Sequence, residues 1–186
     1  MINTGELKRG IAIEMDGDLY SILEFHHIKM GRGSAQVRLK VRNLRTGSTV
    51  EKTVQAGERF TRARMDHHTV QYLYRDGDEY HFMDTESFDQ LVLRPDLLGD
   101  AVNYLKENMT MDLQTYGEEP ISVELAPNVE LRVTYTEPGF RGDTASGGNK
   151  PATVETGATV NVPLFVNIDD MIRVDTRTGA YIERVK

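Results

Sequence analysis

The sequence predicts an all-β protein made of three small barrels in a row. Short apolar runs with a period of two residues recur along the 186-residue chain, and turn residues separate them. Asp-Gly pairs at 16–17 and 76–77 and a Thr-Gly pair at 46–47 are typical of hairpin turns. Three β-rich segments of about 60 residues fit this spacing. We therefore expect domains at 1–64, 65–126 and 127–186.

The individual elements follow from the same pattern. In the first segment we expect strands at 11–13, 20–28, 35–44 and 50–54. In the second, strands are expected at 70–74 and 80–83, and helical spacing indicates short helices at 85–91 and 98–107. Toward the C-terminus, strands are expected at 123–125, 129–135, 160–166, 172–175 and 181–182. Residues 138–157 are rich in Gly, Ser, Thr and Pro, which predicts a long and functional loop.

The net charge of −7 is unevenly distributed. Residues 1–64 hold 12 Lys or Arg against 7 Asp or Glu, residues 65–126 hold 3 against 14, and residues 127–186 hold 7 against 8. A basic end beside an acidic middle suggests that the first segment approaches a polyanion while the middle faces something basic. The alternative is that these are solvated faces of unequal charge.

The chain contains no cysteine, which excludes disulfides, thiolate metal sites and thiol nucleophiles. Residues 1–20 show no signal-peptide pattern, and no apolar run approaches the roughly 20 residues that a membrane span needs. We therefore expect a cytoplasmic protein with no membrane contact. Heptads and large apolar stripes are also absent from the sequence, so we expect a monomer.

Enzyme and metal sites are not indicated. His26-His27 and His67-His68 are adjacent pairs, and neighbouring side chains on a strand point to opposite faces, so neither pair can chelate one ion. The glycine-rich stretch 142–150 lacks the Gly-Lys-Ser/Thr ending of a phosphate-binding loop. No Ser, His and Asp set stands in a nucleophile context, and Asp169-Asp170 is more simply a turn. We expect no metal, no cofactor and no catalytic residue.

A candidate binding site begins at the hairpin sequence HHIKMGRGSAQVRLK, residues 26–40. Gly31 and Gly33 permit a tight turn between two strands, so Arg32, followed by Ser34, would point away from the body of the protein. Basic residues that alternate with apolar ones along the second strand add cations at Arg38, Lys40 and Arg42, with Arg45 close by. Further candidates lie in the third segment: Arg141, Lys150, Arg173, Arg177, Tyr181 and Arg184. Together these residues favour RNA as the partner, through contacts to phosphate groups.

Four stretches resemble the bacterial translation elongation factor P family. They are the hairpin with GRGSA, FMDTESFDQ at 82–90, RGDTASGGNKPATVETGATVNVPLFV at 141–166, and IRVDTRTGAYIERVK at 172–186. The resemblance spans the whole chain. It implies an SH3-like (KOW-type) barrel followed by two OB-type barrels, in an L-shaped outline about the size of a transfer RNA.

The resemblance also implies a function. A family member binds the 70S ribosome beside the peptidyl-transfer RNA and relieves stalling at consecutive prolines, acting as a non-enzymatic accessory to the ribosomal peptidyl transferase. By the same implication, Arg32 reaches the CCA end of the transfer RNA. The loop that contains Gly142, Asp143 and Thr144 lies near the messenger RNA codon in the exit site, and other contacts go to ribosomal RNA.

Three departures from the family pattern stand out. An arginine at position 32 implies either rhamnosylation by an arginine-modifying glycosyltransferase or no modification, because lysine-specific modifications are excluded. Met30 stands where many members have proline, and Asp169-Asp170 replaces a more usual Gly-acid turn. The alternatives are an elongation factor P-like paralogue, a general single-strand RNA-binding protein built from OB-type barrels, and an activator that inserts Arg32 into a nucleotide hydrolase.

Overall fold

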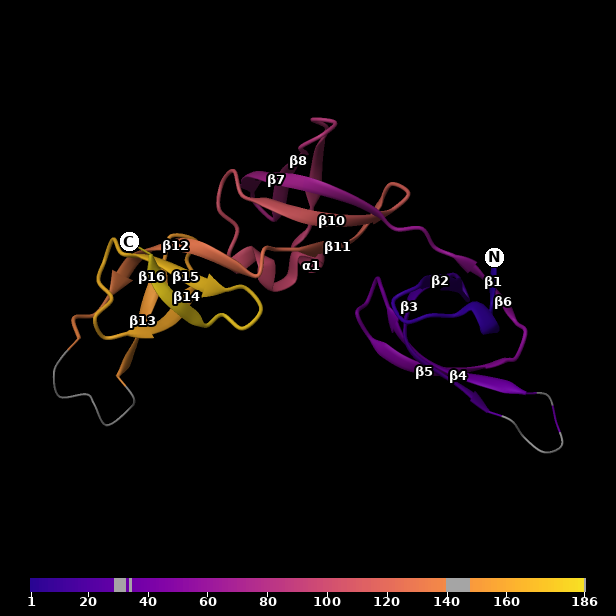
Figure 1. Ribbon diagram of the computed structural model, residues 1–186. Helices are drawn as coiled ribbons and strands as arrows, with labels where there is room; N and C mark the ends of the chain where they lie inside the picture. The colour runs from indigo at the N-terminus through magenta and orange to yellow at the C-terminus, as the bar shows by residue number, and fades with distance from the viewer. Residues whose placement is uncertain (29–32, 34, 140–147, 186) are drawn as a thin grey trace. The chain divides into compact units, whose positions relative to one another are not determined.

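Three sheets form the framework of the protein (Figure 1). The computed structural model describes residues 1–28, 33, 35–139 and 148–185. By their spatial contacts the residues divide into two units. The first comprises Met1–His67 with Gln114–Ser122, and the second comprises His68–Leu113 with Val123–Lys186.

The first sheet has six strands in the order β1-β6-β2-β3-β4-β5. They are β1 (Ile2–Asn3), β2 (Ala12–Met15), β3 (Asp18–Ile28), β4 (Gln36–Asn43), β5 (Thr49–Gln55) and β6 (Arg59–Arg62), with a 3-10 turn η1 (Thr4–Glu6) after β1. The hairpin between β2 and β3 turns at Asp16 and Gly17, whose φ values of 55° and 83° match the type I′ turn that the Asp-Gly pair predicts. Inward side chains form a core around Ile13, Ile22 and Leu39.

The second sheet has the order β11-β10-β7-β8-β9. Its strands are β7 (Asp66–Asp76), β8 (Glu79–Asp84), β9 (Gln90–Leu93), β10 (Thr110–Tyr116) and β11 (Glu119–Glu124). Between β9 and β10 lie α1 (Pro95–Leu98) and the 3-10 helix η2 (Gly99–Asn103). The core of this sheet gathers around Val70, Phe82 and Leu93.

The third sheet has the order β14-β13-β12-β15-β16. Its strands are β12 (Asn128–Thr136), β13 (Asn149–Val154), β14 (Thr159–Pro163), β15 (Met171–Asp175) and β16 (Tyr181–Val185). Its core includes Leu131, Val162 and Ile172, and Tyr104 from the segment after η2 packs into it. The predicted all-β class with three small barrels is confirmed.

Some of the predicted elements are wrong or incomplete. Residues 85–91 do not form a helix, because the Asp84 carboxylate accepts hydrogen bonds from the backbone N–H groups of Glu86 and Ser87 and closes a turn that leads into β9. The helix expected at 98–107 begins earlier, at Pro95, and its α-helical part ends at Leu98 because Gly99 adopts a φ of 52°. The loop expected at 138–157 is shorter, since β13 begins at Asn149.

The unusual Asp169-Asp170 turn has a clear geometry. Asp169 adopts a φ of 71°, the left-handed region that glycine favours and that aspartate tolerates better than most residues. Asp170 fixes the same turn by accepting a hydrogen bond from the backbone N–H of Asn167 at 2.8 Å. No helix in the described residues is long and apolar enough to cross a membrane.

Candidate nucleic-acid interface

The β3–β4 ribbon carries the segment in which the sequence places its main candidate residue. The two strands pair from Tyr20 opposite Asn43 to Ile28 opposite Gln36, with one irregularity between Ile22 and Glu24. Gly31, Arg32 and Ser34 lie outside the described residues. Gly33 is described: it is exposed and adopts a φ of 149°, which favours glycine, and a side chain there would meet no atom within 4 Å.

Strand β4 presents a row of cations on one face. Its residues alternate between buried Val37, Leu39 and Val41 and exposed Arg38, Lys40 and Arg42, because successive side chains of a strand point to opposite faces. In the register of the sheet, Lys40 lies between Glu24 on β3 and Glu51 on β5. Arg38 lies between His26 and Thr53, and Arg42 lies between Ser21 and Thr49, so neither of these arginines has a carboxylate directly opposite it on β3 or β5.

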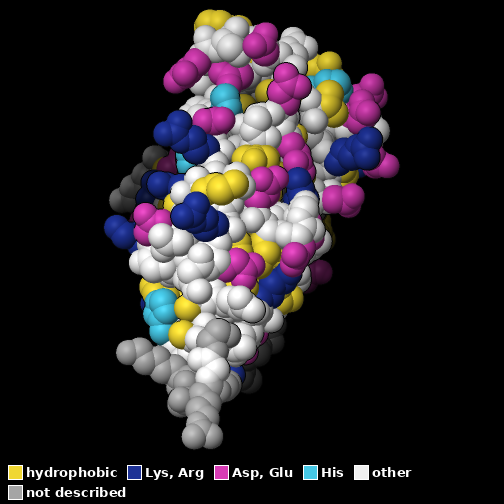
Figure 2. All heavy atoms as spheres, turned by 90° about the vertical axis from the view of Figure 1, so that its right-hand side faces the viewer, with side chains coloured by type: hydrophobic (Ala, Val, Ile, Leu, Met, Phe, Trp, Pro, Cys, Tyr) yellow, Lys and Arg dark blue, Asp and Glu magenta, His cyan; other side chains and the backbone are white. Residues whose placement is uncertain are grey.

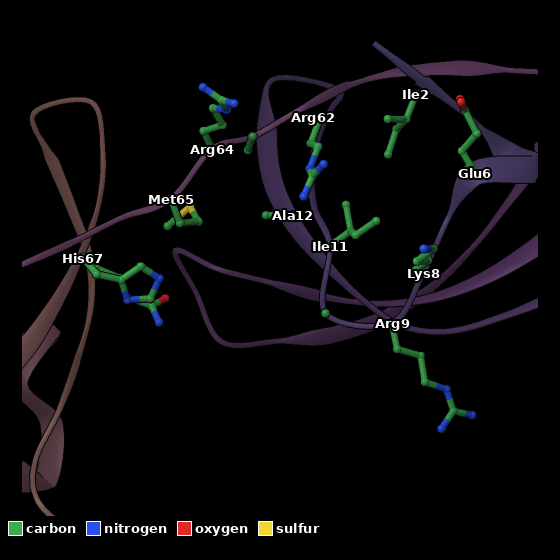
Figure 3. A pocket seen from close by; sticks show the side chains of 13 residues that line it. Ile2, Glu6, Lys8, Arg9, Ile11, Ala12, Arg62, Arg64, Met65 and His67 are labelled. Carbon is green, nitrogen blue, oxygen red and sulfur yellow. The ribbon is translucent and has the colours of Figure 1, made fainter.

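A second basic feature is a hollow of about 910 Å³ in the first unit (Figure 3). Its lining includes five groups that can carry positive charge: Lys8, Arg9, Arg62, Arg64 and His67. We call this set the basic groove. In Figure 3 the Arg62 side chain points into the hollow toward Ala12, whereas Arg9 and Arg64 extend outward from its rim.

Among the described residues, the hollow that holds the basic groove has one carboxylate in its lining, Glu6, and this carboxylate already accepts a hydrogen bond. Glu6 accepts a hydrogen bond from the backbone N–H of Asn3 at 2.9 Å, and the Asn3 side chain accepts one from Gly5, so the pair caps η1. Within the described part of the chain, no salt bridge involves Lys8, Arg9, Arg62 or Arg64. The groove therefore offers several cations to an anionic partner.

Sequence reasoning missed the basic groove because its cations come from distant parts of the chain. Lys8 and Arg9 precede β2, whereas Arg62 and Arg64 lie at and after the end of β6. The pairing of β6 with β1 and with β2 brings the two groups together. The three arginines in RFTRAR, residues 59–64, are the local signal that could have pointed to it, although Arg59 does not line the hollow.

Lys150 does not occupy the surface position that the sequence analysis expects. Its side chain is buried, and Nζ donates a hydrogen bond to the backbone carbonyl oxygen of Glu137 at 2.6 Å. Position 150 faces inward on β13, as Ala152 and Val154 do. The ammonium group thus ties β13 to the end of β12 and is not presented to a partner.

The other predicted cations of the third segment differ in whether their charge is paired with a carboxylate. Arg173 is held by Glu130, at 2.8 Å, and by Glu183, and its pKa is raised chiefly by the hydrogen bond to Glu130. Arg184 lies 3.4 Å from Asp170, with its guanidinium carbon 5.4 Å from the centre of the Phe165 ring. Arg177 is exposed. Arg141, Gly142, Asp143 and Thr144 lie outside the described residues.

Tyr181 is half-buried and packs against the core of the third sheet. It also lines a shallow hollow of about 410 Å³ with Asn149, Asn161 and Thr178. Tyr181 therefore shares a hollow with polar side chains. Among the described residues, no group of three or more His, Asp or Glu side chains could hold a metal ion.

Opposite charges are interspersed over much of the surface. Figure 2 shows Lys and Arg side chains lying among Asp and Glu side chains on the face that it presents. Several are paired, such as Lys52 with Asp16 at 2.6 Å. Against that background, the exposed cations of β4 and the basic groove are the best candidates for contact with phosphate groups.

Comparison with known proteins covers all three sheets. A family model described as the elongation factor P KOW-like domain matches residues 3–60. The model of the elongation factor P OB domain matches residues 65–123, and that of the elongation factor P C-terminal domain matches residues 129–184. These descriptions agree with a KOW-like first barrel and an OB-type second barrel.

Relatives and solved structures agree with this result. Elongation factor P of Moorella thermoacetica is 54% identical over 184 residues, which cover 99% of this chain and 100% of the relative. That of Natranaerobius thermophilus is also 54% identical, over 100% of this chain and 99% of the relative.

A solved structure of translation initiation factor 5A from Methanococcus jannaschii has a TM-score of 0.53 and covers 66% of this chain and 94% of its own. At 20% identity it supports the fold alone. The matches to the three domain models and the full-length relatives together show that the chain belongs to the elongation factor P family.

Proposed function

We propose that this protein binds the 70S ribosome beside the peptidyl-transfer RNA and speeds peptide-bond formation at consecutive prolines. The observation that carries the proposal is the β3–β4 ribbon, a pair of strands with a cationic face that leads to the segment containing Arg32. A ribbon of this kind suits a protein that extends one charged group into a site it cannot enter as a whole.

Proline supplies the physical need for such a group. Its ring fixes φ and makes its nitrogen a hindered secondary amine, so proline is a poor acceptor and a poorly oriented donor in peptide transfer. A guanidinium group can hydrogen-bond the phosphates and bases at the CCA end of the transfer RNA and hold the ester in line for attack. In this account the ribosome carries out the reaction, and Arg32, bare or rhamnosylated, supplies orientation.

The rest of the first domain, residues 1–64, would hold the RNA. The exposed cations of β4 and the basic groove can contact phosphate groups without reading the base sequence. This suits a factor that must act on ribosomes carrying different messages. Ribosomal RNA and the peptidyl-transfer RNA are the proposed partners of these surfaces.

For the third domain, residues 127–186, we propose fewer RNA contacts than the sequence suggested. Gly142, Asp143 and Thr144, with Arg141, are proposed to lie near the exit-site codon. Arg177 is proposed to contact RNA because it is exposed, while Arg173 and Arg184 would first have to leave their carboxylate partners. Lys150 is left out, since its ammonium group is buried.

The rate of a single Pro–Pro peptide bond tests the proposal. Ribosomes that hold a prolyl peptidyl-transfer RNA would be supplied with prolyl-transfer RNA, with and without the protein purified from its native host. We expect the wild type and Arg59→Ala to accelerate the reaction, and Arg32→Ala to lose at least about tenfold of the effect. Arg59→Ala is the matched control because it removes one exposed cation from the same sheet, outside the basic groove. No acceleration by the wild type would refute the proposed function.

The role of the basic groove can be measured separately. Arg62→Gln combined with Arg64→Gln should weaken ribosome binding and reduce its dependence on salt concentration, because fewer counterions are released on binding. Arg59→Gln again serves as the control. An unchanged salt dependence in the double variant would exclude the groove from the interface.

A further inference from the structure

One five-residue turn recurs in each of the three sheets. It begins at Asn43, Asp84 and Asp175, and in each case the side-chain Oδ1 accepts hydrogen bonds from the backbone N–H groups two and three residues later, at 2.8–3.0 Å. The N–H of the fifth residue donates to the backbone carbonyl oxygen of the first, at 2.8–3.0 Å. The N–H of the first residue donates to the carbonyl oxygen of the sixth, at 2.8–2.9 Å. The three turns are thus built in the same way.

The fifth residue of each turn adopts a left-handed backbone. Two turns place glycine there, Gly47 with a φ of 73° and Gly179 with a φ of 71°. The turn in the second sheet places Phe88 there, with a φ of 63°. A bulky side chain in this conformation is strained, because its Cβ lies close to the backbone carbonyl oxygen. Because glycine occupies this position in the other two turns, the geometry of the turn does not require phenylalanine.

The Phe88 side chain is also not used inside the protein. It is 69% exposed, more than any other Phe or Tyr among the described residues. The turn that carries it is held in place, because Asp84 also lies 3.0 Å from Nδ1 of His68, and the Thr85 N–H and hydroxyl both donate to the Thr69 carbonyl oxygen at 2.9 Å. A firmly held turn therefore presents an apolar ring to the outside.

The other two turns contact neighbouring segments of the chain. Arg45 in the first turn pairs with Glu119 through two hydrogen bonds, of 2.8 and 3.0 Å. In the third, the Thr176 hydroxyl donates to the Ala126 carbonyl oxygen at 2.7 Å, and a side chain at Gly179 would come within 3.0 Å of the Tyr104 hydroxyl. Of these three turns, the one with Phe88 carries a side chain at its fifth position, and that side chain is exposed.

The charge around Phe88 decides the kind of partner. The turn contains the exposed carboxylate of Glu86, the next residue is the exposed Asp89, and none of these residues is Lys or Arg. Residues 65–126 as a whole hold 14 acidic against 3 basic residues. Phosphate groups of RNA would be repelled by these carboxylates, whereas Lys and Arg side chains of a protein would be attracted. Aromatic side chains are the usual anchors at the centre of such interfaces.

We infer that Phe88 is a docking anchor that inserts into an apolar recess on a basic protein surface, with Glu86 and Asp89 pairing with cations around it. The inference rests on the proposed function, since it places that protein surface on the ribosome. The strained backbone at Phe88 is then retained because the ring binds a partner. This explanation accounts for both its exposure and its place in a glycine position.

Phe88→Gly tests the inference because folding and binding should respond in opposite directions. Glycine removes the left-handed strain, so the denaturant midpoint should rise. Loss of the ring should weaken binding to 70S ribosomes with an occupied peptidyl site by about tenfold. Phe88→Tyr keeps the aromatic ring and should bind within about twofold of the wild type. Binding of the full chain would be measured at one fixed salt concentration.

A photo-crosslinker in place of Phe88, p-benzoylphenylalanine, identifies the class of partner. The inference predicts a crosslinked product on those ribosomes whose size ribonuclease leaves unchanged, because both of its parts are protein. A product that ribonuclease reduces to about the size of the factor alone would overturn the protein partner. Unchanged affinity of Phe88→Gly beside a wild type that binds would overturn the anchor alone. A wild type that does not bind ribosomes would overturn the proposed function together with the inference.

Discussion

At the scale of single residues, Lys150 shows how a charged side chain can serve the fold. Its aliphatic chain lies inward on β13, and its ammonium group reaches the Glu137 carbonyl oxygen. Sequence reasoning treated it as a surface cation because a lysine in a polar stretch is nearly always exposed. The alternation of Lys150, Ala152 and Val154 was the pattern of a strand, and the charge at its first position concealed it.

Lys150→Ala should therefore destabilise the protein rather than its complex with RNA. It removes a buried aliphatic chain and a hydrogen bond, so the free energy of unfolding should fall by about 2 kcal/mol. Arg177→Ala, at an exposed position, should change it by less than about 0.5 kcal/mol. Chemical denaturation of both variants measures the difference. A Lys150→Ala variant with wild-type stability and weakened ribosome binding would contradict the buried position.

At the scale of elements, the strands of period two were predictable and the turns that resemble helix starts were not. β3, β4 and β12 lie close to their predicted bounds because alternating apolar residues are the direct requirement of a half-buried strand. The helix predicted at 85–91 is wrong because polar residues that accept hydrogen bonds from backbone N–H groups, as Asp84 does, occur at the start of helices and of turns alike. The Gly31 and Gly33 turn made Arg32 a candidate binding residue, but its proposed role could be inferred only by resemblance, since that role depends on a partner and not on packing.

The β10–β11 hairpin shows a second feature that sequence could not reveal. Its Glu119 is bound by Arg45, which also donates to the Gly17 carbonyl oxygen at 3.1 Å and lies 3.3 Å from Asp18. The hydrogen bonds from Arg45 hold the pKa of Glu119 below its ordinary value near 4.5. The partners are 74 residues apart in sequence, so no local pattern links them.

A double-mutant cycle should detect a favourable coupling between Arg45 and Glu119. Because the pKa of Glu119 is lowered in the folded state, the coupling is fully present above the ordinary carboxyl pKa and is lost as the pH falls through the lowered pKa of the folded protein. Denaturation of the wild type, Arg45→Ala, Glu119→Gln and the double variant at pH 7 and pH 3 measures it. Coupling that stays the same at both pH values would contradict a charge-assisted pair.

At the scale of the whole molecule, positive and negative charges lie on different parts of the chain. The first unit holds the cations of β4 and the basic groove, and the acidic segment 65–126 holds Phe88. In our account the former face RNA and the latter faces a basic protein, which explains how an acidic chain can act on the ribosome. The overall excess of basic residues at 1–64 was visible in the sequence, but the groove required the pairing of β6 with β1 and β2.

Synthesis of a reporter with three consecutive prolines tests the central claim most directly. A reconstituted translation system that lacks the factor would receive the native-host wild type, Arg32→Ala or Arg59→Ala, and a reporter with separated prolines would serve as the control template. The account predicts that the wild type and Arg59→Ala restore full-length product from the triproline reporter, that Arg32→Ala does not, and that the control template needs none of them. Equal rescue by Arg32→Ala would contradict the role of the hairpin arginine, and no rescue by the wild type would contradict the function itself.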